Sequence, residues 1–308
     1  MNKKPLIIIC GPTASGKSEL AVRLAKDIGE IISADSMQVY KFMDIGTAKP
    51  DKELLNSVKH YLIDVITPDK DFSAYEFITR AEKIIKTLYQ QKKTPFIVGG
   101  TGLYIRALVY GLSDAPGRDP KIREKLKNIA KEKGLGFLYQ RLKKIDTIYA
   151  DKISPNDPIR IIRALEVYEK TGIPFSKFCE KHIKNPRYDA LWIGINLERK
   201  KLYERINRRT EMMFEKGFID ETKKLLEMGY SEDIIKKRGI GYDDVIDYIQ
   251  GKITLETAIK NVQKKTRHYA KRQLTWFRKE KNIKWFQPDQ IDKIKELINN
   301  WITTINFN

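Results

Sequence analysis

The strongest structural signal in the chain lies in its first 28 residues. The apolar run Pro5–Cys10 is typical of a buried strand. It is followed by a glycine-bearing segment that fits G-x-x-x-x-G-K-[ST] at each fixed position. Residues 19–28 then repeat apolar side chains at helical spacing. A glycine loop between a strand and a helix directs backbone N–H groups at a phosphate. The predicted phosphate loop consists of Gly11, Pro12, Thr13, Ala14, Ser15, Gly16, Lys17 and Ser18.

This loop predicts a ligand that carries a di- or triphosphate, with Lys17 neutralising outer oxygens and the Ser18 hydroxyl able to bind Mg²⁺. It leaves open whether the phosphate is transferred, hydrolysed or released as a leaving group. Hydrolysis would favour an apolar strand that ends in an acidic pair, and the nearest candidate, Asp64, has no adjacent acid. An ordinary ATPase is therefore disfavoured.

Further alternation of strand and helix patterns predicts an α/β fold. Strands are expected over residues 30–34, 60–66, 95–98 and 188–197, and helices over 73–91 and 198–228, the last ended by Gly229. Residues 120–180 show short helical patterns with basic faces and no convincing strand pattern. We therefore predict a parallel-sheet core of the P-loop NTPase type, formed by residues 1–113 and 190–308, with a helical insertion domain at 114–189.

The charge balance predicts an anionic partner. The chain has 59 Lys and Arg against 40 Asp and Glu, a net charge of +19. Residues 260–287 contain ten basic side chains and one acid, and five of the basic ones form a stripe at helical spacing, with Val262, Tyr269, Trp276 and Phe277 between them: Lys260, Lys264, Arg267, Lys271 and Arg278. A basic stripe interleaved with aromatic residues favours contact with an RNA backbone and base stacking over a purely solvated helix.

The remaining composition bears on the location of the chain. Its two cysteines, Cys10 and Cys179, suggest neither a disulfide framework nor a cysteine zinc site. No apolar run reaches the length of a membrane span, and the first four residues leave no room for a signal peptide. We expect a cytoplasmic protein without a membrane partner.

Two polar residues follow predicted strands at the edge where ligands bind in open α/β sheets. Asp35 follows the second strand and Thr101 follows Gly99-Gly100 after the fourth. Asp35 could face Mg²⁺ or a proton-bearing co-substrate, or it could cap a turn through its side chain. Thr101 could be a plain helix N-cap, although the two glycines suggest close approach of the backbone to a ligand.

Six segments give the chain a resemblance to the tRNA dimethylallyltransferases, also called the tRNA isopentenyl-transferase family, in its bacterial form, over nearly the whole length. The segments are GPTASGKS at Gly11, DSMQVYKFMDIGTAKP at Asp35, GGTGLY at Gly99, NDPIRIIRALE at Asn156, IGY at Ile240 and KRQLTWFR at Lys271. The resemblance implies transfer of a dimethylallyl group from dimethylallyl diphosphate to N6 of the adenosine on the 3′ side of the anticodon, with release of diphosphate.

The resemblance also implies roles for residues. Lys17, Thr101 and Asp35 would be catalytic, Mg²⁺ would bind at Ser18, Arg209 would lie near the diphosphate, and the partner would be the anticodon stem-loop of tRNA bound by a monomer. The implied tRNA contacts are Asp35, Ser36, Met37, Gln38, Thr101, Arg123, Ile159, Arg160, Ile161, Ile162, Arg163, Arg238, Gly239, Ile240, Gly241, Tyr242, Lys271, Arg272, Gln273, Leu274, Thr275, Trp276, Phe277 and Arg278.

Several alternatives stay open on the sequence. Arg160 and Arg163 could form a solvated helix face, and Arg209, four residues after Arg205, could form a surface pair with Glu204 or Glu211. Asp243 follows Ile240-Gly241-Tyr242, where the family usually has a basic residue, so one RNA contact is in doubt. A P-loop kinase of small molecules or nucleosides, or an RNA-binding module with a vestigial nucleotide site, are the competing functions; the first leaves the basic stripe unexplained, and intact Lys17 and Ser18 disfavour the second.

Overall fold

The structure is a computed structural model that describes residues 3–181 and 185–304. Of the four residues before the first strand, residues 1 and 2 therefore lie outside the described residues. Its central element is a six-stranded sheet in the order β3-β2-β4-β1-β5-β6, in which each neighbouring pair is parallel. The predicted α/β fold with a parallel sheet is confirmed. The strands are β1 (Pro5–Cys10), β2 (Gly29–Ser33), β3 (His60–Tyr61), β4 (Thr94–Gly99), β5 (Asp189–Ile195) and β6 (Lys284–Phe286).

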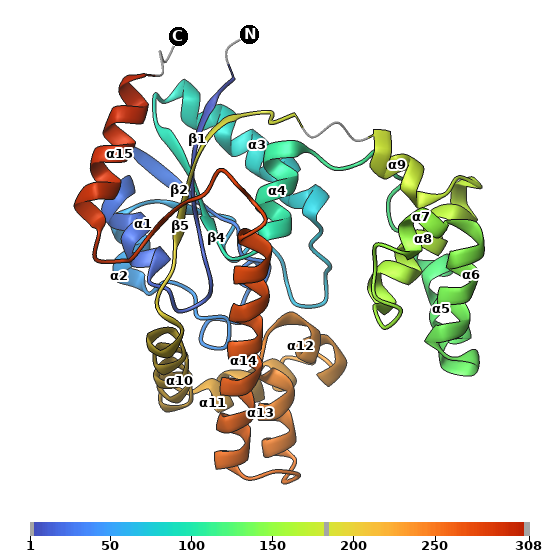
Figure 1. Cartoon of the computed structure of the whole chain (residues 1–308). Helices are drawn as coiled ribbons and strands as arrows, with labels where there is room; N and C mark the ends of the chain where they lie inside the picture. Colours follow the sequence, from blue (N-terminus) through green and yellow to red (C-terminus); the bar gives the residue numbers. More distant parts are fainter. Residues whose placement is uncertain (1–2, 182–184, 305–308) are drawn as a thin grey trace. The chain divides into compact units, whose positions relative to one another are not determined.

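Helices cover both faces of this sheet, which is why β1 is buried along its whole length and reads as an unbroken apolar run. Figure 1 shows α1 and α15 on one face and α3 and α4 on the other. The helices associated with the sheet are α1 (Lys17–Ala25), α2 (Lys52–Ser57), α3 (Ala74–Gln90), α4 (Gly102–Tyr110), α10 (Arg199–Glu215), α11 (Phe218–Glu227), α12 (Glu232–Arg238), α13 (Tyr242–Ile249), α14 (Leu255–Phe277) and α15 (Ile291–Thr303).

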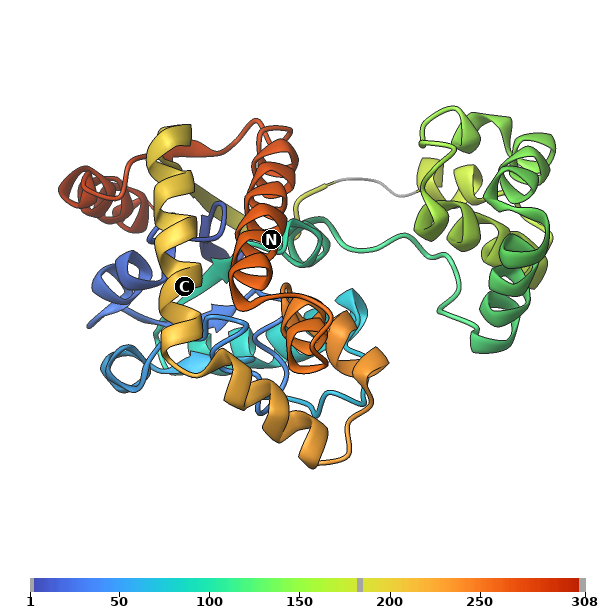
Figure 2. The same ribbon diagram turned by 90° about the horizontal axis from the view of Figure 1, so that it is seen from below.

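The helices α10–α14 lie beyond the carboxyl ends of the strands (Figure 1). Seen from below, α10 and α14 run side by side there, joined by a small core of Leu202, Ile206 and Ala270 (Figure 2). The C-terminal segment therefore covers the edge at which ligands of parallel sheets bind.

Two predicted elements are wrong in extent. The strand expected over residues 60–66 ends at Tyr61, because Leu62 and Asp64 adopt left-handed backbone angles (φ 64° and 56°) that no strand accommodates. The single helix expected over 198–228 is broken into α10 and α11 at Gly217, whose φ of 99° is also left-handed. The predicted end at Gly229 is confirmed, since α11 stops at Glu227 and Gly229 has a φ of 88°.

The chain divides into two compact units, Met1–Val109 with Pro186–Asn308, and Tyr110–Asn185. These borders lie within a few residues of those expected from the sequence. The second unit contains helices and, in its described residues, no strand. Its helices are α5 (Pro120–Lys133), α6 (Leu135–Ile145), α7 (Thr147–Ala150), α8 (Pro158–Thr171) and α9 (Phe175–Lys181).

A buried ion cluster holds the helical unit together in addition to its leucine and isoleucine core. Glu166 of α8 is fully buried, and Arg123 donates to both of its carboxylate oxygens at 2.9 and 3.0 Å. Arg163 donates to it at 2.9 Å and the Asp119 N–H at 2.6 Å. Burial by itself raises the pKa of Glu166, but these hydrogen bonds outweigh burial and place the pKa below its usual value.

We expect Glu166→Gln to destabilise the helical unit by about 2 to 3 kcal/mol near pH 7, because it leaves Arg123 and Arg163 without their buried partner. Since the folded-state pKa of Glu166 is lowered, its stabilisation is present above the ordinary carboxyl pKa and is lost as pH falls through the lower, folded value. Hydrogen exchange of α5 and α8 against pH measures both effects.

The matched control is Glu132→Gln, which removes an exposed carboxylate from α5. A difference between Glu166→Gln and the parent that persists well below the carboxyl pKa would contradict this account.

Candidate active site

The sheet order brings the three predicted loops together. The phosphate loop follows β1, Asp35 follows β2 and Thr101 follows β4, and β2, β4 and β1 are adjacent in the sheet. A cavity of about 370 Å³ opens at this edge. Its lining includes Thr13, Ala14, Gly16, Lys17, Ser18, Asp35, Gln38, Thr47, Ala48, Gly99, Arg205 and Arg209.

The phosphate loop has the conformation that its pattern predicts. Gly16 is left-handed (φ 88°) and immediately precedes α1, which begins at Lys17. Lys17 Nζ donates to the Pro12 carbonyl at 3.1 Å, while Gly11, Pro12 and Ser15 are buried behind the cavity lining. Ser15 Oγ is buried without a hydrogen-bond partner in the described residues. The loop therefore presents a lysine, a serine hydroxyl and a helix N-terminus to one cavity.

Arg209 of α10 joins Lys17 in this cavity, where the resemblance places it. Its NH2 group donates to Thr13 Oγ1 at 2.6 Å, and its Nε is buried without a partner in the described part of the chain. Burial lowers the pKa of Arg209, and Asp35 acts in the opposite direction. A half-buried guanidinium whose buried Nε–H is an unused donor beside a phosphate loop is suited to a bound anion.

Burial likewise lowers the pKa of Lys17 to about 8; Asp35 raises it and Arg209 lowers it further. Arg205 adds a third cation, with its guanidinium beside Gly16. The sequence left open a surface pair of Arg209 with Glu204 or Glu211, but Arg209 lines the cavity and donates to Thr13, and the exposed Arg205 lines the cavity as well. Both follow β5, whose neighbour is β1, so only the sheet pairing brings them to the loop.

Asp35 caps a turn and also borders a cavity. Its Oδ1 accepts from the Met37 N–H at 2.9 Å, which is the turn-capping role. Its side chain also lines the large cavity and a second cavity of about 40 Å³, which is bounded on other sides by Met37, Ile240, Thr266 and Tyr269. Asp35 and Arg209 thus lie at the boundary between the two cavities.

Thr101 supports the turn that carries Asp35. Its Oγ1 accepts from the Ser36 N–H at 2.9 Å and donates to Ser36 Oγ at 3.2 Å, while the Thr101 N–H donates to the Ala34 carbonyl at 3.1 Å. Thr101 also directly precedes α4, as a helix N-cap would. The hydroxyl of Thr101 therefore holds Ser36 in place, and its backbone N–H holds Ala34.

The two glycines before Thr101 allow close approach of other parts of the protein, whereas the sequence suggested close approach of the backbone to a ligand. A Cβ on Gly99 would lie 2.2 Å from the Ala34 carbonyl oxygen, and one on Gly100 would lie 2.1 Å from Gln273 Nε2. The close approach at these positions is of protein to protein, although Gly99 also borders the large cavity.

Gln273 connects two of the three loops. It is 5% exposed, its Oε1 accepts from the Thr13 N–H at 2.8 Å, and its Nε2 donates to the Gly100 carbonyl at 3.0 Å. The structure thus gives this residue, which the resemblance places among the RNA contacts, an internal role. It ties the phosphate loop and the Gly99–Thr101 segment to α14.

We expect Gln273→Ala to lower the free energy of unfolding by about 1 to 3 kcal/mol, because it leaves the Thr13 N–H and the Gly100 carbonyl without partners. Because the phosphate loop loses an anchor, we also expect a higher KM for the phosphate-bearing substrate that the loop binds. Urea denaturation and steady-state kinetics measure the two effects. The control is Thr275→Ala on the exposed side of α14, and equal effects of the two substitutions would contradict the bridging role.

Several other residues implied as RNA contacts have buried side chains. Ile161, Tyr242 and Phe277 are at most 2% exposed, and Ile162 is 9% exposed. Phe277 is therefore not an open stacking platform, which corrects the stacking interpretation at this position of the window at residues 260–287. Trp276 is half-buried and packs against Gly102. Tyr269 is also half-buried and lines the small cavity, where burial raises its pKa.

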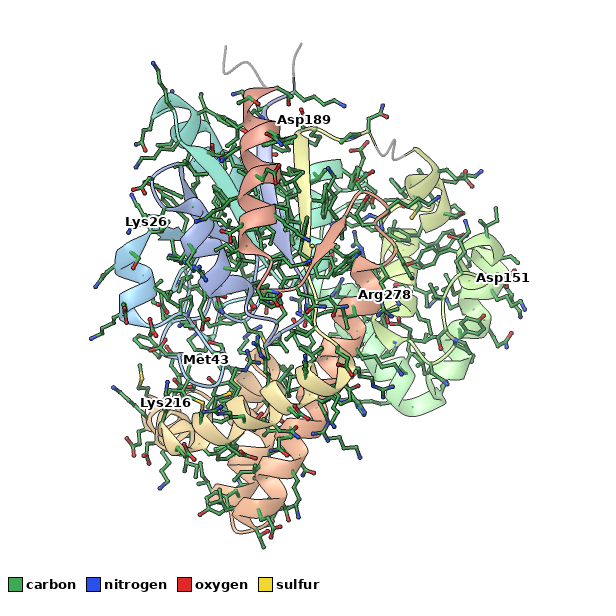
Figure 3. All side chains as sticks on the ribbon, turned by 60° about the vertical axis from the view of Figure 1, so that its left-hand side comes forward. Lys26, Met43, Asp151, Asp189, Lys216 and Arg278 are labelled. Atoms are coloured by element: carbon green, nitrogen blue, oxygen red, sulfur yellow. The ribbon has the colours of Figure 1, made fainter. Side chains whose placement is uncertain are left out.

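The basic stripe on α14 is exposed at four of its five positions: Lys260, Lys264, Lys271 and Arg278. Arg267 is instead half-buried, donates to Asn207 Oδ1 at 2.6 Å and lies over the ring of Tyr203. Among the other implied contacts in this motif, Arg272 and Thr275 are exposed, and Leu274 is half-buried in the small core with α10. Figure 3 shows the long side chains on α14 and labels Arg278 at its end.

The unusual Asp243-Asp244 pair is explained by a neighbour on α14. Lys265 Nζ lies 2.5 Å from Asp243 Oδ2 and 2.6 Å from Asp244 Oδ2. One lysine of the basic window is thus neutralised within the protein, next to the segment Gly239–Tyr242. Arg238, another implied contact, donates to the Pro68 carbonyl and to Asp71 and lies over the ring of Tyr40.

In the helical unit, some of the implied RNA contacts are held by partners within the protein and others are accessible. Arg123 and Arg163 are bound to Glu166, and Arg163 also donates to the Pro116 carbonyl at 2.7 Å. Arg160 pairs with Asp157, the N-cap of α8, yet is half-exposed, and Ile159 beside it is 77% exposed. Arg160 and Ile159 are therefore the accessible part of this motif.

Asp64, the weak candidate for an acid that binds Mg²⁺, does not line either cavity and instead pairs with Lys49 at 2.5 Å. Within the described residues there is no cluster of three or more His, Cys, Asp or Glu suited to a metal ion. Ser18 lines the large cavity, and Mg²⁺ in phosphate sites takes few protein ligands in addition to phosphate oxygens and waters. The residues present fit that mode.

No helix in the described ranges combines the length and apolarity needed to cross a bilayer.

The chain is similar to known proteins over almost its full length. The profile of a family described as IPP transferase matches residues 38–280. A tRNA dimethylallyltransferase of Acetivibrio thermocellus is 48% identical over 96% of this chain and 95% of its own, and tRNA dimethylallyltransferase 2 of Geotalea daltonii is 50% identical over 92% and 88%.

Solved structures show the same similarity. A tRNA delta(2)-isopentenylpyrophosphate transferase from Staphylococcus epidermidis has a TM-score of 0.70 at 40% identity, with 98% of this chain and all of that chain covered. A eukaryotic dimethylallyltransferase acting on tRNA has a TM-score of 0.84 at 27% identity, over 98% of this chain and 80% of that one.

Proposed function

Because the chain belongs to the IPP transferase family and is a tRNA prenyltransferase, we propose that it transfers a dimethylallyl group from dimethylallyl diphosphate to N6 of the adenosine 3′ to the anticodon. One observation carries the assignment of groups to the site. Asp35 and Arg209 line both the large cationic cavity and the small one beside it. The donor diphosphate is assigned to the large cavity, and the adenine amine approaches Asp35 from the side of the small one.

The large cavity supplies what the leaving group needs. When the bond between the allylic carbon and the diphosphate oxygen breaks, the electron pair stays on the diphosphate. Lys17, Arg209 and the phosphate-loop N–H groups then face the added negative charge without having to reorganise. Mg²⁺ bound at Ser18 would supply further neutralisation of the diphosphate.

Asp35 accepts the proton. As the bond between N6 and the allylic carbon forms, the amine loses one proton, and a carboxylate placed to take it accelerates such a step by about 10² to 10⁴-fold. Thr101 and Met37 hold the turn that carries Asp35. We assign Thr101 to positioning of that turn.

The RNA is gripped at exposed basic positions. Lys260, Lys264, Lys271 and Arg272 of α14, Arg278 at its C-terminal end and Arg160 of α8 contact the phosphate backbone, and the exposed Ile159 beside Arg160 offers an apolar contact. The target base leaves its loop stack to reach the buried edge of the sheet, as enzymes that modify bases require.

We further propose that the protein is cytoplasmic and that its working form is a monomer. Sedimentation analysis tests the monomeric state.

The decisive experiment offers the purified protein an unmodified tRNA with either labelled dimethylallyl diphosphate or γ-labelled ATP. We expect label from the allylic donor in the tRNA and none from ATP. A kinase acting on small molecules or nucleosides, the competing function, would give the opposite pattern, and transfer of the ATP label to any acceptor without allyl transfer would overturn the proposal.

A further inference from the structure

The loop after Asp35 forms a wall of the large cavity, which is called the donor cavity below. Gln38, Thr47, Ala48 and Pro50 all line it. The loop contains no helix or strand from Ser36 to Pro50, and Ala48 has a left-handed φ of 51°. Such a conformation costs energy for a residue other than glycine and persists only where surrounding contacts impose it. The contacts that impose it therefore also set the shape of the cavity.

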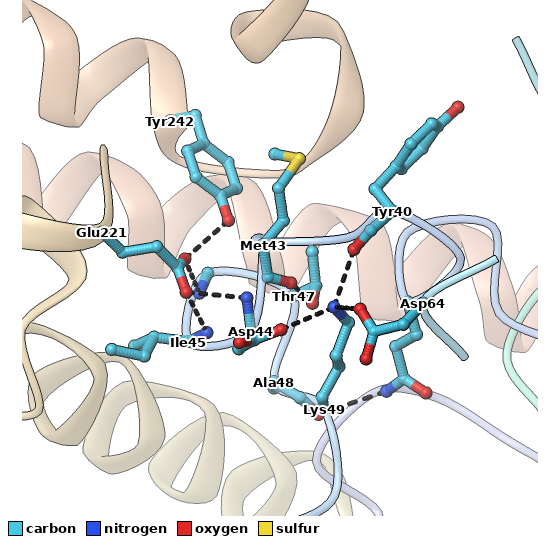
Figure 4. A network of polar contacts seen from close by, with 12 residues as sticks. Tyr40, Met43, Asp44, Ile45, Thr47, Ala48, Lys49, Asp64, Glu221 and Tyr242 are labelled. Atoms are coloured by element: carbon cyan, nitrogen blue, oxygen red, sulfur yellow. Dashed lines mark hydrogen bonds and ion pairs between the residues drawn. The ribbon is translucent and has the colours of Figure 1, made fainter. Parts of the chain in front are cut away.

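Glu221 of α11 is the main external contact of this loop (Figure 4). Its Oε2 accepts from the N–H groups of Asp44 and Ile45, both at 2.7 Å, and its Oε1 accepts from the Gly46 N–H at 2.9 Å. Three successive backbone donors thus converge on one carboxylate, and such charge-assisted hydrogen bonds are stronger than those between neutral groups. In Figure 3, Met43 marks the loop and Lys216 marks the turn before α11.

Tyr242 completes this set of donors. Its hydroxyl donates to Glu221 Oε1 at 2.8 Å, and its fully buried ring packs edge-on against Phe218 with 4.8 Å between centroids. Burial and the adjacent Glu221 raise the pKa of Tyr242 well above its ordinary value, so it remains a donor. A Cβ on Gly46 would lie 2.5 Å from the Tyr242 hydroxyl, and one on Gly239 would lie 2.5 Å from its ring.

Two further contacts hold the same loop. Lys49 Nζ donates to the Tyr40 carbonyl at 2.7 Å and to Asp44 Oδ1 at 2.6 Å. Arg238, three residues before Gly241, lies over the Tyr40 ring at 4.9 Å. The segment from Arg238 to Tyr242 therefore contacts the loop through both of its end residues, Arg238 at Tyr40 and Tyr242 at Gly46. Gly46 is joined directly to Thr47 and Ala48, which line the cavity.

We propose that Glu221 and Tyr242 are positioning residues for the transfer reaction, which hold Asp44–Gly46 so that Thr47 and Ala48 close the donor cavity. The inference rests on the proposed function for its kinetic consequence. It changes the role of the Ile240-Gly241-Tyr242 segment, because Tyr242 acts on the donor site through Glu221 and not through contact of its side chain with RNA.

Glu221→Gln tests the proposal, because glutamine keeps the shape but supplies one acceptor oxygen and adds an NH₂ group that faces backbone donors. We expect the donor KM to rise and kcat/KM for the donor to fall about 10 to 100-fold, since hydrogen bonds to a charged group are lost. The Kd for tRNA in the absence of donor stays within about twofold, because the phosphate-contacting lysines are untouched. Exchange of the Asp44, Ile45 and Gly46 amides accelerates.

Two variants complete the design. Glu227→Gln makes the same change at an exposed position of α11 and is expected to leave kinetics and amide exchange at parental values. Tyr242→Phe keeps the buried ring and removes one of four donors to Glu221, so it should shift the donor KM in the same direction as Glu221→Gln by a smaller factor. If Glu221→Gln does not fold, Tyr242→Phe and its amide exchange decide the question.

Donor kinetics and amide exchange of Glu221→Gln at parental values would overturn the proposal. Weaker tRNA binding by Tyr242→Phe with parental donor kinetics would overturn it as well, since it would give Tyr242 an RNA role. An inactive parent would refute the proposed function instead, and amide exchange at Asp44–Gly46 would still report whether Glu221 holds the loop.

Discussion

Asp35→Asn is expected to lower turnover by about 10² to 10⁴-fold while tRNA binding is retained. Asparagine keeps the side-chain oxygen that accepts from the Met37 N–H, so the turn after β2 stays intact. What it loses is the ability to take a proton from the adenine amine. Single-turnover transfer with both substrates saturating measures the chemical step, and the Kd for tRNA is measured on the same preparation.

The control for Asp35→Asn is Asp292→Asn, which removes an exposed carboxylate from α15 in the same unit. It should leave turnover unchanged. Parental turnover in Asp35→Asn would remove Asp35 from the mechanism, and loss of tRNA binding together with turnover would assign it to recognition.

Lys17→Met is expected to lower kcat/KM for the donor by about 10² to 10³-fold, the usual effect of removing one preorganised group that faces developing charge. Methionine fills the space of the lysine stem, and Arg209 remains as a cation in the cavity. Steady-state kinetics with dimethylallyl diphosphate varied and tRNA saturating measures the effect. A variant with parental kcat/KM would show that the diphosphate binds elsewhere.

The lowered pKa of Lys17 adds a pH signature to this prediction. Burial disfavours the charged form, so Lys17 is cationic below about pH 8 and loses its charge as pH rises through that value. Since kcat/KM reports ionisations of the free enzyme, it should fall above pH 8, whereas kcat should not, because bound diphosphate retains the proton on Lys17. Lys17→Met should lack this limb, and its persistence in the variant would assign the limb to another group.

The sequence predicted the parts of the site that lie within single loops. The phosphate loop, Asp35 and Thr101 were found because each follows an apolar strand, and parallel strands place their carboxyl ends at one edge. Arg209 was placed by resemblance alone. Arg205 had no signal beyond its spacing from Arg209, because its approach to Gly16 depends on the pairing of β5 with β1.

The residues whose roles changed are those that act between distant segments. Gln273 contacts Thr13 across 260 positions, and Glu221 contacts Asp44 across 177. The motifs that contain Gln273 and Tyr242 resemble RNA contacts, yet their side chains point inward. A motif records that a residue type is needed but does not record whether the partner is RNA or another loop of the same chain.

The amino-acid sequence by itself determined the parallel α/β core, the glycine-bearing loop between β1 and α1 and the basic surface of α14, because hydrophobic period, glycine pattern and charge spacing are local properties. Only the tertiary structure decided that Arg123 and Arg163 hold Glu166, that Gln273 joins two loops, and that Glu221 and Tyr242 hold the cavity wall. These contacts arise from packing of segments far apart in the chain, where a buried polar group takes whichever partner the fold brings within hydrogen-bond distance.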